Sequence, residues 1–473
     1  MYRQDVTVTF AVLLLIGSVT AGFSGYNPVQ NASASTNPNL FVSAENSQFQ
    51  NYFAGPQVIQ VIVSDPDINR LDQAYGEPTV TINGKKLRMA QATDGNWYAY
   101  FADRNQAIAA DKTVGLAGKG LDFGQFCSSL STFSPKAGVD YSETKGFTVA
   151  KAGITGAVDK PANAAAITAC TTATAPAGAK ITHVIREEKT LNTNGAGFAA
   201  NANYTGIWPV VQLYDFSGFP TDVLVDYHKA GGDQIVLLHF DRIPTNLIST
   251  SVDRTAYPVN SQVFVQMNDP QLNIDPTEED SWTWGTNATN STLYYQAFNR
   301  NGGADADGTA GMQNLIGNLT NFMFNHNGQF TLNPAAQGVN VLDFQKNGKE
   351  PLKSADGTGR GQTNAVRTAS IGFSSAPVTF IESGGVNTGT FADWDGGKIA
   401  NLITSNTQAI RDVSATIRYN DVSTSIVGGF GFASLTVTAT NNTWAGGQKI
   451  PVTLTDTDAN RNSKITEHLD LFN

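Results

Sequence analysis

The stretch AGPQVIQVIVSDPDIN, residues 54–69, occurs again as AGGQKIPVTLTDTDAN at residues 445–460. The two copies align without a gap and share Ala, Gly, Gln, Ile, Val, Asp, Asp and Asn at the same places. A looser copy, YPVNSQVFVQMNDPQLN, occupies residues 257–273. Repetition at so long a period indicates an array of similar modules.

Further landmarks follow the phrase in the same order. Residues 223–238 are echoed by residues 414–429, with Tyr227 matching Tyr419. A Glu-x4-Asn-Thr motif occurs after the first copy and again after the middle copy, at residues 187–193 and 382–388. A single V-x-V-x-D phrase arises by chance in any β-rich protein, whereas three landmarks in one order indicate a true repeat.

The spacing of the repeated aspartate gives the length of the unit. Asp269 follows Asp65 by 204 residues, and Asp456 follows Asp269 by 187. Because one β-sandwich takes about a hundred residues, we expect two sandwich domains in each complete unit. We interpret the chain as the N-terminal fragment of a longer protein. We place the first repeat unit at 46–250, the second at 251–444, and the start of a third, truncated unit at 445–473.

Composition and turn signals favour an all-β fold. Charged residues make up only 15 % of the chain, and glycine occurs 45 times. Stretches rich in β-branched residues, such as VIQVIV (58–63) and SATIRY (414–419), are separated by turn residues. Many short strands at this spacing are typical of β-sandwiches. We predict tandem sandwiches with low helix content and one helix over residues 311–324.

The N-terminal residues 1–21 have the pattern of a secretory signal peptide. Arg3 precedes an apolar run at residues 10–16, and small residues follow at 19–21. The alternative is a buried N-terminal strand, and Asp5 is the main objection to the signal. Residues 22–45 are small and polar with two prolines and predict a linker. We expect an extracellular protein with no membrane span in this fragment.

Two cysteines, Cys127 and Cys170, both fall in the first unit. An exported protein meets oxidising surroundings, so we predict a disulfide, the alternative being two free buried thiols. Six sequons permit N-glycosylation, although a chain so rich in Asn, Ser and Thr contains several by chance. The candidate asparagines are Asn31, Asn203, Asn287, Asn290, Asn318 and Asn441.

The formal net charge is −10. This sign is wrong for nucleic-acid binding, which needs cationic side chains against phosphates. It is favourable for cations, including divalent ions that neutralise groups of carboxylates.

The tail of the last copy is rich in oxygen ligands and predicts a structural Ca²⁺ site. Arg461 stands where an EF-hand loop has Gly, and Ser463 where it has an apolar residue, so we predict a calcium loop on a β-scaffold instead of an EF-hand. The alternative is an Asx-turn whose carboxylates cap backbone N–H groups. Positions 1, 3, 5, 7 and 12 of the loop are Asp456, Asp458, Asn460, Asn462 and Glu467.

The two earlier copies carry shorter versions of this ligand set. We predict weaker candidate metal sites there. The first copy offers Asp65, Asp67 and Asn69, and the middle copy offers Asp269, Asn273, Asp275 and Asp280.

Catalytic signals are thin. None of the five histidines lies in an HExxH motif or pairs with another at metal-ligand spacing, and no nucleophile elbow or P-loop is present. We therefore predict no catalytic residues and no enzyme. Trp282 and Trp284, next to acidic residues 278–280, form the one cluster we would test for ligand binding, although core packing explains most tryptophans here.

Several long segments resemble surface-layer (S-layer) proteins of ammonia-oxidising archaea. They include the signal peptide, residues 71–108, residues 255–284 and the closing DTDANRNSKITEHLDLFN. The resemblance covers most of residues 50–473. It implies tandem immunoglobulin-like domains, a porous two-dimensional lattice made of copies of the protein, calcium binding and glycosylation. It offers no catalytic residues.

From these observations we expect a structural subunit of a cell-surface lattice, an acidic porous coat that calcium stabilises and that concentrates cations. The alternative function is a secreted, multi-module carbohydrate-binding or adhesion protein.

Overall fold

The computed structural model describes most of the chain from residue 37 onward. The predicted signal peptide and most of the predicted linker lie outside the described part. The structure describes residues 37–72, 76–112, 121–149, 184–192, 207–218, 220–286, 291–297, 313–314, 323, 328–333, 335–336, 339–345, 376–394, 397–405, 411–438 and 443–469.

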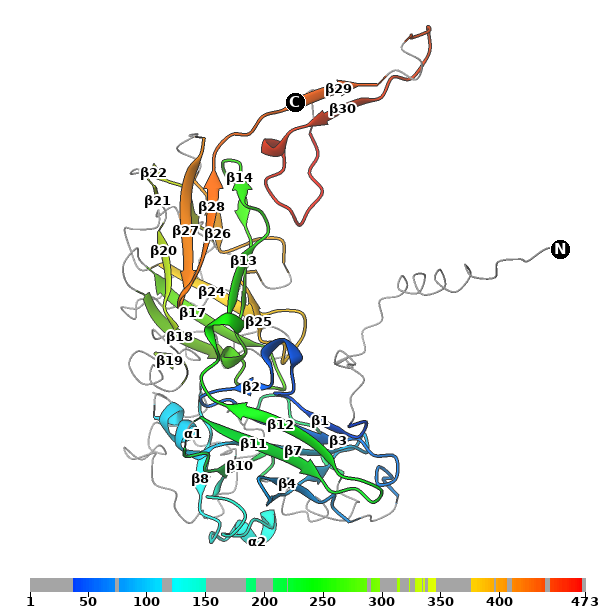
Figure 1. The fold of residues 1–473 in the computed structure, drawn as a ribbon, viewed down its shortest axis with the longest axis vertical. Coiled ribbons are helices and arrows are strands. Elements are labelled where there is room, and N and C mark those ends of the chain that lie inside the picture. Colours follow the sequence, from blue (N-terminus) through cyan, green and yellow to red (C-terminus); the bar gives the residue numbers. More distant parts are fainter. Residues whose placement is uncertain are drawn as a thin grey trace, which may run out of the picture. The chain divides into compact units, whose positions relative to one another are not determined.

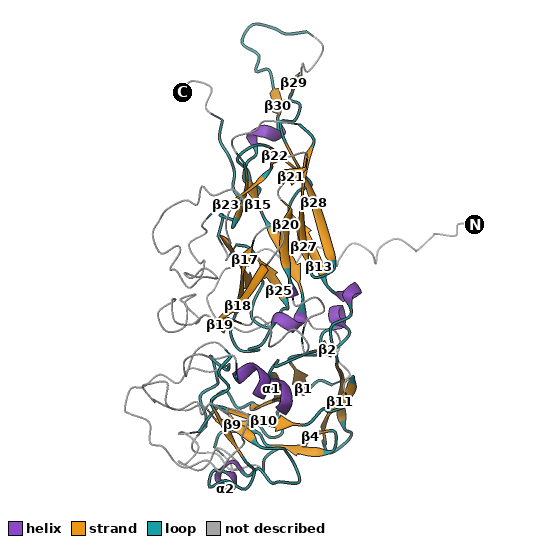
Figure 2. Cartoon of the chain, turned by 90° about the vertical axis from the view of Figure 1, so that its left-hand side faces the viewer, coloured by secondary structure: helices purple, strands orange, loops and turns teal. Residues whose placement is uncertain are grey.

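The fold is all-β, as predicted (Figure 1). Figure 2 shows strands throughout the described chain and only short helices. The helices are α1 (Arg104–Asp111), α2 (Ser134–Ala137) and the 3-10 turns η1 (Ser47–Phe49), η3 (Thr245–Leu247), η4 (Pro270–Leu272) and η6 (Thr457–Ala459).

The first module is built from two sheets. The larger contains β1 (Leu40–Val42), β3 (Ile59–Val63), β6 (Ala90–Gln91), β7 (Trp97–Asp103), β8 (Gln125–Cys127), β9 (Phe147–Val149) and β10 (Val210–Tyr214). The smaller contains β2 (Tyr52–Phe53), β4 (Val80–Ile82), β5 (Lys85–Leu87), β11 (Thr221–Tyr227) and β12 (Gln234–Phe240).

Alternation along the strands explains why these two sheets pack together. β3 alternates buried and half-buried residues, and β11 does the same over its last five residues. Successive side chains of a strand point to opposite faces, so each strand places one apolar row inside. Val61 and Trp97 of one sheet share a core with Val225 and Leu238 of the other.

The second module has the same general construction. Its largest sheet contains β13 (Ser249–Val252), β16 (Val265–Asn268), β17 (Asp280–Thr286), β18 (Ser291–Ala297), β19 (Gln313–Asn314), β24 (Ala376–Glu382) and β25 (Thr390–Ala392). A second sheet contains β14 (Ala256–Tyr257), β20 (Phe330–Asn333), β27 (Val413–Tyr419) and β28 (Val422–Gly428). Smaller sheets contain β15 (Gln262–Val263), β23 (Leu342–Phe344) and β26 (Leu402–Thr404), and β21 (Ala335–Ala336) with β22 (Val339–Asn340).

The third copy of the phrase contains β30 (Val452–Thr455), which forms a two-stranded sheet with the preceding β29 (Ser434–Val437). This hairpin repeats a pairing found in both modules. β1 pairs antiparallel with β3, β13 with β16, and β29 with β30. The three copies of the phrase therefore occupy the same structural position, the second strand of an opening pair.

The first strand of each opening pair lies before or across a boundary that the sequence predicted. β1 lies inside the predicted linker 22–45, β13 begins before residue 251, and β29 begins before residue 445. In each copy the strand before the phrase pairs with it, so these strands lie before or across the predicted boundaries, which stay predictions. In addition, the described strands of the first unit form one pair of sheets, where we expected room for two sandwiches.

The low helix content is confirmed, whereas most of the one predicted helix is not tested. The predicted helix 311–324 lies mostly outside the described residues, and its residues 313–314 form β19. The sequence interpretation missed α1. Its N-cap is Asp103, whose side chain accepts a hydrogen bond from the Gln106 N–H.

Candidate functional site: the joints between modules

The repeated aspartate ends a strand in each copy of the phrase and turns the chain. The carboxylate of Asp65 accepts the N–H of Asp67 at 3.0 Å, and that of Asp269 accepts the N–H of Gln271 at 3.1 Å. Asp456 accepts the N–H of residue 458 at 2.9 Å. All three are Asx-turns, the alternative to calcium binding that the sequence left open.

A tyrosine from the second repeated stretch, residues 223–238 and 414–429, donates a hydrogen bond to the same aspartate. The Tyr227 hydroxyl donates to Asp65 at 2.8 Å, and the Tyr419 hydroxyl donates to Asp269 at 2.6 Å. These are the two tyrosines that match in the sequence, at the ends of β11 and β27. The matched landmarks therefore describe one contact, an aspartate–tyrosine pair that ties the phrase to the second sheet of its module.

The remaining donor to this carboxylate differs between the modules. In the first, the Lys229 ammonium lies 2.5 Å from Asp65 and 3.3 Å from Asp67, so one protein cation contacts both predicted carboxylate ligands. In the second, the Gln271 side chain donates to Asp269 at 2.7 Å. Burial without a cation raises the pKa of Asp269 to about 6.

After the turn, each loop docks on the module before it through the same backbone hydrogen bond. Val58 donates its N–H to the carbonyl of Ile274 at 3.0 Å, and Gln262 donates to the carbonyl of Arg461 at 2.8 Å. Val58 and Gln262 each lie seven residues before their own aspartate, and Ile274 and Arg461 each lie five residues after theirs. We call these contacts the first joint and the second joint.

The carboxylate predicted to close each calcium loop instead fastens the docking residue. Asp280 accepts the N–H groups of Ile274 and Asp275, and Glu467 accepts the N–H of Arg461 at 2.6 Å. Both acids lie eleven residues after the aspartate, and Ile274 and Arg461 are equivalent. The sequence spacing that suggested an ion sphere is thus satisfied by capping inside the loop.

The first joint contains a buried ion pair. The Arg186 guanidinium lies 3.1 Å from Asp275 and 3.0 Å from Asp280, and all three side chains are almost fully buried. Arg186 also donates to the carbonyls of Glu278 and Glu279, at 3.1 and 2.9 Å. The sequence interpretation missed this arginine, which lies directly before the Glu-x4-Asn-Thr motif.

The carboxylates of the first joint outnumber this cation. Glu382 lies next to Asp280, whose N–H it accepts at 3.4 Å. Burial, and then repulsion by Asp280, raises the pKa of Glu382 to about 8. Burial raises the pKa of Asp275 to about 7 even though Arg186 opposes the shift. Burial therefore favours the protonated form of these two acids, in addition to the charge that Arg186 supplies.

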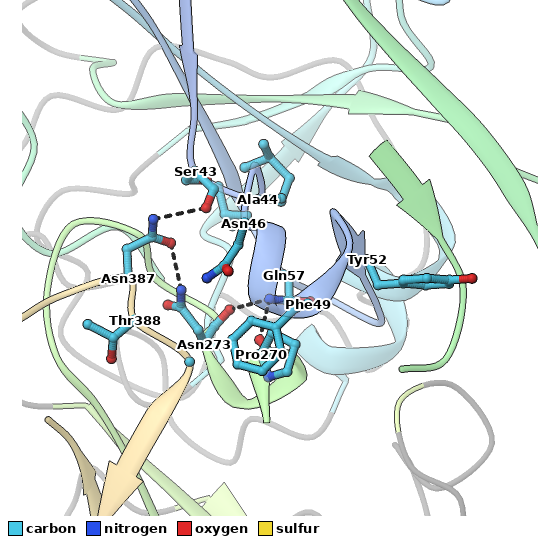
Figure 3. A pocket seen from close by; sticks show the side chains of 13 residues that line it. Ser43, Ala44, Asn46, Phe49, Tyr52, Gln57, Pro270, Asn273, Asn387 and Thr388 are labelled. Atoms are coloured by element: carbon cyan, nitrogen blue, oxygen red, sulfur yellow. Dashed lines mark hydrogen bonds between the residues drawn. The ribbon is translucent and has the colours of Figure 1, made fainter. Parts of the chain in front are cut away.

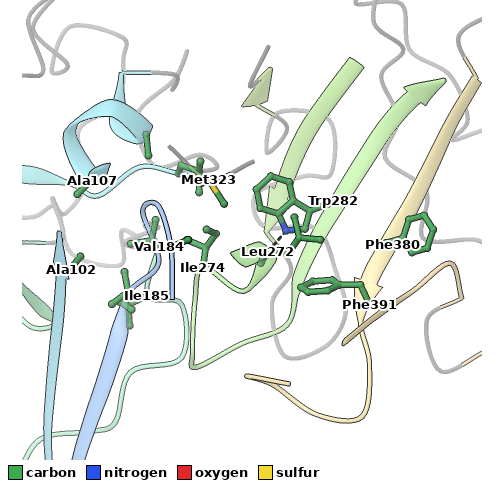
Figure 4. Packing of buried hydrophobic residues seen from close by; sticks show 14 of the residues in the cluster. Ala102, Ala107, Val184, Ile185, Leu272, Ile274, Trp282, Met323, Phe380 and Phe391 are labelled. Carbon is green, nitrogen blue, oxygen red and sulfur yellow. Dashed lines mark hydrogen bonds between the residues drawn. The ribbon is translucent and has the colours of Figure 1, made fainter. Parts of the chain in front are cut away.

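An apolar core continues across the first joint. Ile274 and Leu272 of the docking loop are fully buried, in one cluster with Val184 and Ile185 of the first module and Trp282 of the second (Figure 4). Full burial of an Ile side chain contributes about 1.5–3 kcal/mol. The first joint is therefore packed as a core.

A small polar pocket of about 20 Å³ opens beside this core (Figure 3). Gln57 donates to the carbonyls of Pro270 and Asn273, at 2.6 and 2.8 Å. Asn273 donates to Asn387 at 2.7 Å, and Asn387 donates to the Ser43 carbonyl at 2.9 Å. The volume suits a single water molecule, so the pocket has no room for an organic substrate.

The second joint is more open and uses different side chains. Asn462 donates to the Lys398 carbonyl at 2.6 Å, and Ser463 donates to Asp253 at 2.6 Å. The Lys464 ammonium lies 4.0 Å from the ring centre of Trp394 and 5.0 Å from that of Phe264, a cation–π arrangement.

The remaining predicted ligands are also distributed among protein contacts. Asp458 accepts the N–H of Gly431 at 2.9 Å, and the carbonyl of Asn460 accepts from Arg254 at 2.6 Å. The side chain of Asp67 is 80 % exposed, and Asn69 is exposed. Several of these carboxylates accept hydrogen bonds from the protein, and calcium binding by the loops stays a prediction.

A second cluster was missed because its spacing fits no common motif. Asp226 and His228 of the β11 end face Asp233 across a Gly-Gly turn, and their ligand atoms lie within 4.8 Å of one another. His228 contacts the two carboxylates at 3.7 and 3.3 Å. The sequence did contain a usable pattern, because alternate residues of a predicted hairpin lie on one face and Asp226 and His228 are two residues apart.

Other predicted features divide between the core and the undescribed part. Trp282 and Trp284 are fully buried, and their indole N–H groups donate to the carbonyls of Leu272 and Gly328, both at 2.7 Å. They pack the core and offer no face to a sugar. Cys127 lies on β8, but Cys170 lies outside the described residues, so the disulfide stays a prediction. All six candidate glycosylation asparagines also lie outside them.

Comparison with family models found no match for this chain, and comparison with curated proteins found none either. Within the described residues, no helix is long and apolar enough to cross a membrane.

Proposed function

We propose that the chain is a structural, non-enzymatic segment of a cell-surface layer protein, built from immunoglobulin-like β-modules in series. The observation that carries this proposal is the repeated joint. A backbone hydrogen bond between equivalent residues, Val58 to Ile274 and Gln262 to Arg461, links each loop to the module before it.

The physical requirement for a lattice subunit is fixed geometry between modules. Domains joined by small polar contacts move relative to one another by default, whereas an apolar interface restrains them. The first joint has such an interface, with Ile274 fully buried, and a buried ion pair beside it. A repeated, restrained joint supports a structural role better than a catalytic one.

The chemistry of the surface agrees with an exposed, extracellular position. The net charge of −10 and the low fraction of charged residues suit a soluble coat in contact with cations. The lattice itself is proposed from the resemblance to surface-layer proteins. In this proposal the partners are copies of the chain, and the acidic coat concentrates cations. Calcium at the loop of residues 456–467 belongs to the same proposal.

The alternative, carbohydrate binding, has lost its main candidate residues. Sugar-binding sites use exposed aromatic faces, and the described surroundings of Trp282 and Trp284 are core. The pocket at the first joint is also too small for a sugar ring. No observation favours this second function over the first.

Electron microscopy of the purified chain, with calcium and with a chelator, tests the proposal. We expect ordered sheets or arrays with calcium and smaller, less regular assemblies with the chelator. Arg186→Ala removes the buried cation of the first joint and should make the arrays less regular. Arg70→Ala on the exposed surface serves as the matched control. A chain that stays monomeric under all conditions, with or without glycan binding, would overturn the proposal.

A further inference from the structure

The hairpin of β11 and β12 in the first module (Figure 1) brings one histidine and two aspartates together at its turn. Tyr227 of β11 faces the core, so the alternation of the strand places Asp226 and His228 on the outer face. The register pairs Tyr227 with Gln234, which is also buried, so Asp233 lies on the same outer face as His228. We call Asp226, His228 and Asp233 the turn cluster.

The ligand atoms of the turn cluster are already close to one another. One ring nitrogen of His228 and one carboxylate oxygen of each aspartate lie within 4.8 Å of one another. The His228 Nδ1 atom lies 3.3 Å from the Asp233 carboxylate, and the Nε2 atom lies 3.7 Å from that of Asp226. The side chains of His228 and Asp233 are 40 and 49 % exposed, so an ion can reach the cluster from solvent.

Backbone hydrogen bonds fix the strand ends that carry the turn cluster. His228 donates its N–H to the Thr79 carbonyl at 2.9 Å, and Gly232 donates to the Lys229 carbonyl at 3.0 Å. Gly231 and Gly232 have φ values of 102° and 143°, a region of backbone conformation that favours glycine. A ligand set on strand ends that are already fixed loses little conformational freedom when an ion binds.

The carboxylates of the turn cluster have no lysine or arginine partner among the described residues. Lys229 follows His228 directly, but its ammonium contacts Asp65 at 2.5 Å. The Oδ1 atom of Asp226 is buried, and no described residue donates a hydrogen bond to it. Burial raises the pKa of Asp226, and His228 opposes the shift while Asp233 adds to it. Because a buried carboxylate oxygen without a donor is costly, a bound cation would stabilise this arrangement.

The other end of the same hairpin provides an internal comparison. Asp222 lies opposite His239 in the register, and the His239 Nδ1 atom lies 2.7 Å from its carboxylate. This pair is a close contact between one histidine and one carboxylate. His228 instead lies between two carboxylates at longer distances. Of the two ends, only the turn cluster offers three ligands.

We propose that the turn cluster is a binding site for a divalent transition-metal ion, of which Zn²⁺ is the type. Zn²⁺ takes histidine nitrogen and carboxylate oxygen as ligands, and a site with three protein ligands leaves its fourth position to water. Imidazole suits Zn²⁺, whereas Ca²⁺ takes about six to eight oxygen ligands. The turn cluster is therefore a different kind of site from the acidic loops. The proposal does not rest on the surface-layer function, because all three ligands lie in one hairpin of one module.

Isothermal titration of the full chain with Zn²⁺, in the presence of excess Ca²⁺, tests the site. The Ca²⁺ competes for sites made only of oxygen atoms, so the remaining heat reports sites that contain nitrogen. We expect His228→Ala to bind one Zn²⁺ fewer than the parent chain. Asp226→Asn keeps the shape of the side chain and should weaken binding at this site at least about tenfold. Zn²⁺ should also raise the temperature of thermal unfolding more in the parent than in His228→Ala.

The matched control is His239→Ala, which should bind as much Zn²⁺ as the parent because His239 contacts a single carboxylate. Thermal unfolding of each variant without Zn²⁺ checks that the fold is kept. Equal Zn²⁺ binding by His228→Ala and the parent would overturn the proposal and leave His228 as an ordinary surface ion pair. The same loss in His239→Ala, or complete displacement of Zn²⁺ by excess Ca²⁺, would overturn it as well.

Discussion

The two joints use the same backbone geometry with opposite degrees of burial. In the first, Ile274 is fully buried and Arg186 lies between two buried carboxylates. In the second, the equivalent Arg461 is exposed, and Lys464 packs on the outside of an aromatic pair. The repeat therefore preserves main-chain positions, and the side chains determine how firmly each joint is held.

Removing the buried cation of the first joint should have the largest effect. Arg186→Ala leaves two buried carboxylates without their partner, which costs about 3–5 kcal/mol when one member of a buried pair is lost. We expect hydrogen exchange at the Val58 amide, which donates across this joint, to accelerate strongly, and exchange at Gln262 to stay unchanged.

The matched variant in the second joint is Arg254→Ala. Arg254 donates to the Asn460 carbonyl at an exposed site, where such contacts contribute about 0–1 kcal/mol. Hydrogen exchange at the Gln262 amide should accelerate only slightly, and exchange at the Val58 amide should not change. Equal effects of the two substitutions on their own joints would show that the difference in burial does not set the strength of each joint.

The aspartate–tyrosine pairs allow the same comparison inside the modules. Tyr419→Phe removes a donor from the fully buried Asp269 and should lower the free energy of unfolding by about 2 kcal/mol. Tyr227→Phe should cost less, about 1 kcal/mol, because the Lys229 ammonium still neutralises Asp65. Urea unfolding of the two variants measures both values, and a larger loss for Tyr227→Phe would show that Lys229 does not compensate.

The first joint should also weaken as pH rises. Burial raises the folded-state pKa of Asp275 to about 7 and that of Glu382 to about 8, above the range of about 4 in an unfolded chain. Between these limits the folded state binds more protons, so the stabilisation is complete at low pH and is lost as pH rises through the folded-state values.

Exchange at the Val58 amide, corrected for its intrinsic pH dependence, should therefore show easier opening at pH 8 than at pH 5. Asp275→Asn keeps the shape of the side chain and removes the titration, so it should flatten part of this dependence. A profile that is identical in the variant and the parent would locate the titrating group elsewhere.

The recurring positions of this fold could be predicted because each lies in a short, continuous stretch of sequence. The phrase, its aspartate and the matched Tyr227 and Tyr419 could be aligned by eye, and the structure brings each aspartate to its tyrosine. Alternating apolar residues predicted the strands for the same reason, since the period of a strand is a property of neighbouring residues.

The contacts of the joints could not be predicted in this way. Arg186 lies about ninety residues from Asp275 and has no sequence signal beyond its position before a glutamate. The eleven-residue spacing to Asp280 and Glu467 was visible, but spacing alone does not tell whether a carboxylate accepts a metal ion or a backbone N–H. Only the fold supplies the competing donors, and here it supplies Ile274 and Arg461.

Calcium binding is the smallest expected effect, and it should differ between the loop of residues 456–467 and the equivalent loop of the second module. The loop of residues 456–467 is mostly exposed, and Asp456 and Glu467 each use one carboxylate oxygen for a backbone N–H. We expect it to bind Ca²⁺ with a Kd of about 0.1–1 mM, the range of extracellular modules. The equivalent loop of the second module should not bind, because Arg186 holds the place of a cation between its carboxylates. Isothermal titration of the full chain with Ca²⁺ measures this, with Asp456→Asn expected to remove the heat and Asp269→Asn to leave it. No heat in the parent chain would mean that these carboxylates only cap their turns.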